Sequence, residues 1–213
     1  MCGCENKSRF WGFLMTGLLA VSLFLPAVRA EGATAAFEEL FEEIGADEIT
    51  DNVFNLVGKT ITVITAGRIG EHNSMAASWG GFGILFDKPA TWCFLSASRF
   101  TLEKMQAEGS YTFSWFPDEY KEDVLFFGGK SGRDSDKMKE SKLTPVATPS
   151  GLATYAEARL VIECRLVEVT TVAPDDFRTE ESRKFIEDGR KTAPDYHKIA
   201  LGEIAKVWRK KPR

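Results

Sequence analysis

Alternating apolar and polar positions divide most of the chain into short strands separated by turn-forming residues. The clearest pair is Thr60 to Thr65, rich in β-branched residues, and Asn73 to Gly81, with a polar turn over 67–72 between them. This pattern predicts two strands joined by a reversal, with His72 exposed in the turn. Small residues in the second strand would let a flat ligand approach the backbone closely. The same composition also fits an ordinary hairpin with an Ala/Ser-rich edge.

Further along the chain the same criteria predict more strands and a few helices. The additional strands are predicted over 91–96, 111–116, 156–169 and 197–207. In the longest, four apolar residues share one face, namely Leu160, Ile162, Cys164 and Leu166. Helices are predicted over 33–44, over 102–107 and over 118–127.

Capping and turn residues set the expected limits of these helices. Thr101 is the predicted N-cap of the second helix and Gly109 its end, while Gly128 and Gly129 end the third. The segment from Phe82 to Pro89 is predicted to be a turn-rich connection, and 175–194 a charged, partly helical excursion between strands. Short strands without regular strand–helix alternation predict a mainly β fold, a β-barrel with peripheral helices.

The first 30 residues have the pattern of an export signal. Lys7 and Arg9 precede an uncharged, mostly apolar stretch over 10–28, and Val28-Arg29-Ala30 resembles a cleavage site. We therefore expect a signal peptide over 1–30 and a periplasmic or extracellular protein. An uncleaved membrane anchor is the alternative, since the apolar stretch is long enough to span a bilayer. A helical lead-in over 31–52 and a single globular domain over 53–213 are expected to follow.

Composition argues against several classes of function. The chain has 213 residues and a formal net charge of −4, whereas a nucleic-acid-binding surface is normally basic. It has no GxGxxG, GxSxG, HExxH or Walker motif. With two histidines, and only Cys93 and Cys164 beyond residue 30, no metal site is predicted. Both cysteines lie in apolar strand-like segments, which favours two buried thiols over a disulfide.

Five short motifs occur in an order that resembles one family. They are Asn73-x-Met75-Ala76-Ala77-Ser78-Trp79-Gly80, Ser98-Arg99-Phe100-Thr101, Ser131-Gly132-Arg133-Asp134-x-Asp136-Lys137, Glu163-Cys164-Arg165 and His197-x-Ile199-x-Leu201-Gly202-Glu203-Ile204. With them, the chain from about 53 to 207 resembles the flavin reductase-like proteins with an FMN-binding split β-barrel, the flavoredoxin group in particular. It departs from the family at Ala76, where Thr is common, and in the charged excursion over 179–192, where relatives usually turn tightly.

The resemblance implies a homodimer that holds FMN at the barrel rim, near the subunit interface. The residues implied in FMN binding are Asn73, Met75, Ala76, Ala77, Ser78, Trp79, Ser98, Arg99, Thr101 and Lys137. Among them, Arg99 and Thr101 would address the phosphate, and Lys137 would approach the flavin ring. Simpler roles remain open: solvated charges for the two cations, a core position for Trp79, and a hydrogen-bonded strand histidine for His197, which is the one weak catalytic candidate.

The predicted function is that of an exported FMN-dependent oxidoreductase. It would act either as an NAD(P)H:flavin reductase, with NAD(P)H as a transient donor, or as a flavoredoxin-type electron carrier. Because NAD(P)H is a cytoplasmic pool, export favours a carrier fed by a protein or quinone donor. Two alternatives remain: a non-catalytic split barrel that binds flavin or haem, and a barrel that has lost its cofactor, which Ala76 makes conceivable.

Overall fold

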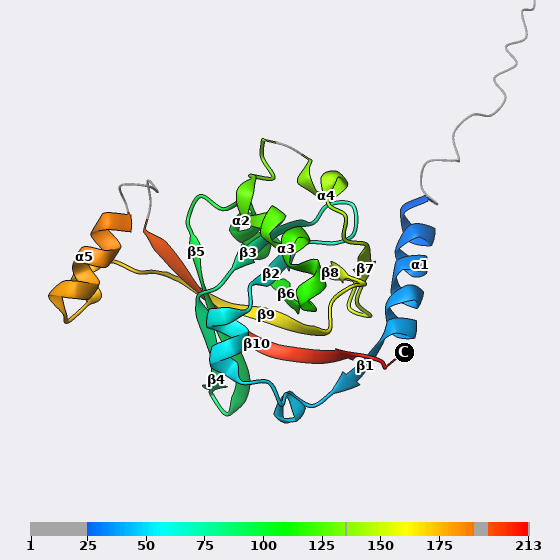
Figure 1. The fold of residues 1–213 in the computed structure, drawn as a ribbon, viewed down its shortest axis with the longest axis horizontal. Coiled ribbons are helices and arrows are strands. Elements are labelled where there is room, and N and C mark those ends of the chain that lie inside the picture. The colour runs from blue at the N-terminus through cyan, green and yellow to red at the C-terminus, as the bar shows by residue number, and fades with distance from the viewer. Residues whose placement is uncertain (1–24, 135, 190–195, 213) are drawn as a thin grey trace, which may run out of the picture.

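The computed structural model describes residues 25–134, 136–189 and 196–212, with the backbone alone for 25–32. Within them lies an antiparallel sheet of eight strands in the order β3-β2-β6-β9-β10-β5-β4, with β1 paired to the end of β10 (Figure 1). Its strands are β1 (Phe41–Ile44), β2 (Thr62–Ala66), β3 (Asn73–Ala77), β4 (Gly80–Leu85), β5 (Lys88–Ser96), β6 (Ser110–Trp115), β9 (Leu160–Thr171) and β10 (His197–Lys210). A separate pair is formed by β7 (Pro145–Ala147) and β8 (Ala153–Tyr155). The mainly β fold is therefore confirmed.

Helices lie around this sheet rather than between its strands (Figure 1). The α-helices are α1 (Leu25–Leu40), α2 (Phe100–Glu108), α3 (Lys121–Gly129), α4 (Lys137–Glu140) and α5 (Glu180–Gly189). Shorter helical turns are η1 (Ala46–Glu48), η2 (Asn55–Lys59), η3 (Asp118–Tyr120) and η4 (Pro174–Asp176). In the part of the chain that the structure describes, none of these helices is long and apolar enough to span a membrane.

Strands β2 and β6 and the first half of β9 are buried on both faces, because two hydrophobic clusters pack against them. Ile64 and Ile162 point into the first cluster, whereas their chain neighbours Val63 and Val161 point into the second. The four apolar residues predicted to share one face of β9 do pack against the first cluster. Cys93 and Cys164 are buried free thiols, as expected. Two-sided burial explains why these strands read as continuous apolar runs.

The predicted helix over 33–44 is wrong in its last turn. The helix ends at Leu40, and Phe41 to Ile44 form β1, paired with β10. Phe37 and Phe41 still share one cluster, with ring centroids 4.5 Å apart. The spacing of apolar residues therefore predicted correctly that Phe37 and Phe41 are buried. It could not show that the chain changes from helix to strand between them. The expected helical lead-in over 31–52 is accordingly helix, strand and a short 3₁₀ turn.

The predicted strand over 73–81 is interrupted, and the turn-rich connection over 82–89 is mostly sheet. Strand β3 ends at Ala77, and β4 begins at Gly80 and forms a hairpin with β5. Glycine fits here because a Cβ at Gly81 would lie 2.3 Å from the Trp92 ring, which covers this strand. A packing contact with a residue eleven positions away thus requires the glycine that made the segment look like a turn.

Smaller boundary errors occur at three other elements. Helix α2 begins at Phe100 with Arg99 as N-cap, so Thr101 lies in its first turn and does not cap it. Helix α3 runs through Gly129, after a 3₁₀ turn over 118–120. The long strand begins at Leu160 instead of residue 156, and residues 190–194 of the charged excursion lie outside the described residues.

Candidate functional site

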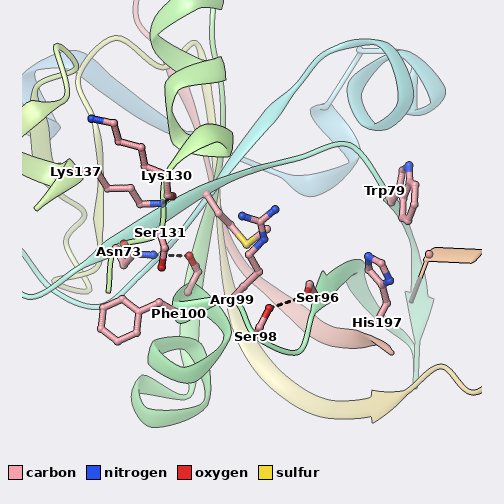
Figure 2. Close-up of a pocket in the computed structure, with 14 residues that line it drawn as sticks. Asn73, Trp79, Ser96, Ser98, Arg99, Phe100, Lys130, Ser131, Lys137 and His197 are labelled. Atoms are coloured by element: carbon pink, nitrogen blue, oxygen red, sulfur yellow. Dashed lines mark hydrogen bonds between the residues drawn. The ribbon is translucent and has the colours of Figure 1, made fainter. Parts of the chain in front are cut away.

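A cavity of about 590 Å³ opens at one end of the sheet, where β3, β5, β10 and the start of α2 meet the loop after α3 (Figure 2). It is lined by Asn73, Met75, Trp79, Ser96, Ser98, Arg99, Phe100, Thr101, Lys130, Ser131, Gly132, Lys137, Gly189 and His197. Its volume falls in the range of about 300–1,000 Å³ that is usual for small-molecule sites.

Asn73 connects three of these segments. It is the first residue of β3, and its buried Nδ2 donates a 2.7 Å hydrogen bond to Oγ1 of Thr101 in the first turn of α2. The backbone of Gly132 lies against the same side chain, since a Cβ there would be 2.0 Å from Asn73 Oδ1. The loop after α3 can therefore approach the amide only as glycine, and the amide fixes the wall of the cavity.

Arg99 supplies a positive charge to the middle of the cavity. It is the N-cap of α2, and Figure 2 shows its side chain between the Asn73–Lys137 end and the Trp79–His197 end. Among the described residues, no hydrogen bond or ion pair engages its guanidinium group. A helix N-terminus carries a partial positive charge, so Arg99 and α2 together favour an anion at this place.

Lys137 is a buried cation at the other end of the cavity. Only 2% of the residue is exposed, and its Nζ donates to the carbonyl oxygens of Lys130, at 3.0 Å, and Phe127, at 3.3 Å. Burial, together with the nearby charge of Arg99, lowers the pKa of Lys137 to about 8. The ammonium group thus binds the carbonyl end of α3, where a positive charge is favoured, and stays beside the cavity.

The balance of charge in the cavity is positive. None of the described residues that line it is acidic. Lys130 contributes less than its position suggests, because its Nζ forms a 2.5 Å ion pair with Glu140. Arg99 and Lys137 are therefore the cations that remain for a ligand, and the site suits a molecule with an anionic group.

The opposite end of the cavity is aromatic. Trp79 and His197 lie with ring centroids 5.4 Å apart, and Trp79 is 49% exposed. Burial and the charge of Arg99 lower the pKa of His197, so that its ring is neutral at neutral pH. A flat, partly apolar group would find contact surface here, while its anionic part reached Arg99.

Most of the residues predicted as a cofactor site meet in this cavity. Those that line it are Asn73, Met75, Trp79, Ser98, Arg99, Thr101 and Lys137, together with His197. Ala76 and Ala77 instead pack against the two hydrophobic clusters, and Ser78 is exposed without lining the cavity. Six further lining residues were not predicted as site residues from the sequence, namely Ser96, Phe100, Lys130, Ser131, Gly132 and Gly189. Three of them, Phe100, Ser131 and Gly132, lie inside the motifs quoted above.

His72 is not exposed, contrary to the prediction. Its ring is buried close to Tyr155, at 6.3 Å between centroids, and neither nitrogen makes a well-formed hydrogen bond within the described structure. Burial lowers the pKa of His72 to about 4, although the Arg68 carbonyl and Asp136 oppose this and Lys104 adds to it. Only the two ends of the turn, Gly67 and His72, are buried, while Arg68, Gly70 and Glu71 are exposed as its polar composition indicates.

Fold and cavity together define an antiparallel barrel protein with a positively charged cavity at its rim. Residues 54–212 match the family described as "Flavin reductase like domain". The chain belongs to the flavin reductase-like family. A search of curated proteins gave no match. The described residues contain no group of three or more His, Cys, Asp or Glu side chains placed to hold a metal ion.

Solved structures of similar fold include an FMN-binding protein and a flavoredoxin. An FMN-binding protein from Thermus thermophilus with bound 1-cyclohex-2-enone is 20% identical, with a TM-score of 0.55 over 79% of this chain and 80% of that one. Flavoredoxin from Methanosarcina acetivorans is 22% identical, with a TM-score of 0.54 over 79% and 75% of the two chains. A Shewanella frigidimarina protein with a split barrel domain is 17% identical, with a TM-score of 0.54 over 70% and 65%. The fold is the split barrel, as predicted.

Proposed function

We propose that this protein binds FMN in the rim cavity and acts as an oxidoreductase. The observation that carries the proposal is the convergence of Arg99 and Lys137 with the Asn73–Thr101 hydrogen bond in one cavity that has no acidic lining residue among those described. Family membership supports it, because the similar structures include an FMN-binding protein and a flavoredoxin.

The residues of the cavity fit FMN in kind and in place. Arg99 at the N-terminus of α2, with the hydroxyl group of Thr101, would hold the phosphate. Gly132 lines the cavity, and its backbone packs against Asn73, which holds the loop after α3 at the cavity wall. Trp79 and His197 would bound the flavin ring, and the positive charge of Lys137, at the far end of the cavity beyond Arg99, would add to the attraction for the phosphate. Bound FMN would supply the capacity to accept hydride or electrons at N5 and to pass them on.

Titration of the purified protein with FMN tests this proposal. Binding should perturb the visible flavin absorption bands and quench flavin fluorescence, and riboflavin, which lacks the phosphate, should bind more weakly. A protein that neither perturbs the spectrum of FMN nor is stabilised by it would refute the proposal. Reversible reduction and reoxidation of the bound flavin would then distinguish an electron-transfer protein from a flavin store.

The electron donor follows from a second measurement on the same complex. Rapid bleaching by NADH or NADPH would define a flavin reductase. Bleaching by dithionite alone would define a flavoredoxin-type carrier fed by a protein or quinone donor, which is the form we favour for an exported protein.

We also propose that the protein is a homodimer. Strand β4 is a sheet edge, and Ile84 on it and Phe86 beyond it are 73% and 84% exposed. Ile84 borders an apolar cavity that Val53 and Phe82 also line, and a second copy of this chain would cover this surface. Sedimentation velocity should show a dimer, and Ile84→Asp should convert it to a monomer. A monomeric wild-type protein would contradict the proposal.

Export is proposed on the sequence of the first 30 residues. Helix α1 continues through the expected cleavage site at Ala30. Mass spectrometry of the protein from its native host should give a chain that begins at Glu31. An intact chain in the membrane fraction would support the anchored alternative, and an intact chain in the cytoplasm would contradict both.

A further inference from the structure

A second, apolar cavity adjoins the first one. Its volume is about 440 Å³, and it lies between the barrel and the excursion formed by η4 and α5, which Figure 1 shows standing out from the side of the sheet away from α1. It is lined by Trp79, Phe94, Phe177, Glu181, Ser182, Phe185, Ile186 and His197. Trp79 and His197 also line the first cavity, so the two spaces share a wall.

Local bonds hold the excursion in shape, while its apolar face is left incompletely packed. The amide of Ser182 donates to Thr179 Oγ1 at 3.3 Å, and Arg183 Nε donates to the Phe177 carbonyl at 2.9 Å. No described residue of α5 is buried, and Phe185 remains 59% exposed although its ring centroid is 5.8 Å from that of Trp79. Aromatic side chains of the barrel and of α5 thus face a space that another flat ring can fill.

Charge separates the two cavities. Arg99 and Lys137 belong to the first cavity, whereas the segment from 174 to 196 carries seven acidic and five basic residues. Glu181 is the charged residue among those that line the second cavity. A ligand with a phosphate or carboxylate group would therefore be disfavoured in the second cavity and favoured in the first.

The polar groups around the second cavity suit a neutral oxygen-bearing ligand. Ser182 offers a hydroxyl group, and the His197 ring, neutral because burial and Arg99 lower its pKa, can donate one N–H to a carbonyl oxygen. Aromatic walls with a few polar groups at one side are the usual composition of sites for small apolar ligands.

We propose that the cavity between Trp79 and α5 binds a flat, uncharged ring that carries a carbonyl group, of the quinone class. The inference rests on the proposed function, because the reduced, quinol form of such a ligand would pass two electrons and two protons to FMN in the adjoining cavity, leaving the quinone and FMNH2. It deepens that function by assigning the partner: a small neutral ring and not a nicotinamide dinucleotide, whose anionic pyrophosphate group is disfavoured beside Glu181.

Calorimetric titration with menadione, a naphthoquinone, tests the site without relying on activity. Menadione should bind both the FMN-free and the FMN-loaded protein. Phe185→Ser should weaken its binding about tenfold, as expected for the loss of one aromatic wall. Phe54→Ser is the matched control, because Phe54 is 85% exposed and does not line this cavity. Both variants should bind FMN like the wild type, which shows that the fold and the first cavity are intact.

The outcomes separate this inference from the proposed function. Equal menadione affinity in the wild type and both variants, or no binding at all, would overturn the inference even if FMN binds. Displacement of menadione by NADH from the FMN-loaded protein would also overturn it, by making the cavity a nicotinamide site. If FMN does not bind, the proposed function fails, but Phe185-dependent binding of menadione to the FMN-free protein would still establish the apolar site.

Discussion

Gly132→Ala tests how closely the loop after α3 fits against Asn73. A methyl group at this position would lie 2.0 Å from Asn73 Oδ1 and 3.2 Å from the Phe100 ring, where ordinary contact begins near 3.4 Å. The amide oxygen or the loop would therefore have to move by about 1.4 Å, the difference between 2.0 Å and the ordinary contact distance of 3.4 Å. A shift of this size would break the 2.7 Å hydrogen bond from Asn73 to Thr101 if the amide moves.

The free-energy cost of Gly132→Ala follows from the steric overlap with Asn73. Overpacking costs about 1–3 kcal/mol, and a lost buried hydrogen bond about 1 kcal/mol. We expect a total of about 2 kcal/mol, divided between stability and FMN binding. If the substituted protein keeps the wild-type arrangement, its free energy of unfolding falls; if the loop relaxes, FMN has to restore the arrangement and its dissociation constant rises up to about 30-fold.

Urea unfolding of the FMN-free protein and fluorescence titration with FMN measure the two parts. Gly129→Ala is the matched control, because it lies in the same segment and a Cβ there would meet nothing within 4 Å. In helix α3 the control should be neutral or stabilising by up to about 1 kcal/mol. If Gly132→Ala equals this control in both measurements, the argument from the fit of the loop is refuted.

Three other predictions concern charges. Arg99→Gln should weaken FMN binding about 10- to 100-fold but leave riboflavin binding unchanged, since it removes a charged donor to the phosphate. Arg178→Gln is the control, because Arg178 is exposed and lies outside the cavity. An equal loss of affinity for riboflavin would contradict the assignment of Arg99 to the phosphate. Because the pKa of Lys137 is lowered to about 8, its charge is lost as the pH rises through 8, so the FMN dissociation constant should rise between pH 7 and 9 in the wild type and not in Lys137→Met; a flat wild-type profile would argue against Lys137 as a ligand. His72, with a pKa lowered from 6.5 to about 4, stays neutral in the folded protein while the unfolded chain takes up a proton below pH 6.5, so stability should fall by about 1.4 kcal/mol per pH unit between these values. Urea unfolding from pH 7 to 4.5 should show this component lost in His72→Phe, and an identical slope in the two proteins would refute it.

Local sequence patterns predicted those strands whose burial pattern can be read within one short stretch of the chain. Strands β2 and β9 were recognised from apolar runs, which two-sided burial explains, and β6 from its alternation of aromatic and small polar residues. Strand β3 was recognised from the polar turn that separates it from β2. Strand β4 was missed because its glycines accommodate Trp92, a contact that no window around residues 80–85 contains. The end of α1 was placed wrongly because Phe37 and Phe41 are buried in one cluster whether the chain there is helical or extended.

The candidate site was only partly accessible from sequence, for the same reason. Arg99, Thr101 and Lys137 were named through the family motifs, and the structure brings them together. The burial of Lys137, and its bonds to the carbonyl end of α3, depend on a helix that ends several residues earlier in the chain. A charged run such as Asp134 to Lys137 looks the same in sequence whether its lysine is solvated or buried. The second cavity depends on where α5 stands, which no local pattern determines.

The length of β10 has a consequence for how the protein can be approached. His197 begins this strand at the cavities, and Val207 to Lys210 end it beside β1, where the chain arrives from α1. At about 3.3 Å per residue, the two ends are separated by up to about 40 Å of strand. Helix α1 and the face at Trp79 and α5 therefore lie at opposite ends of β10, as Figure 1 shows. A partner that contacts α1 would therefore leave the face at Trp79 and α5 open to a second molecule.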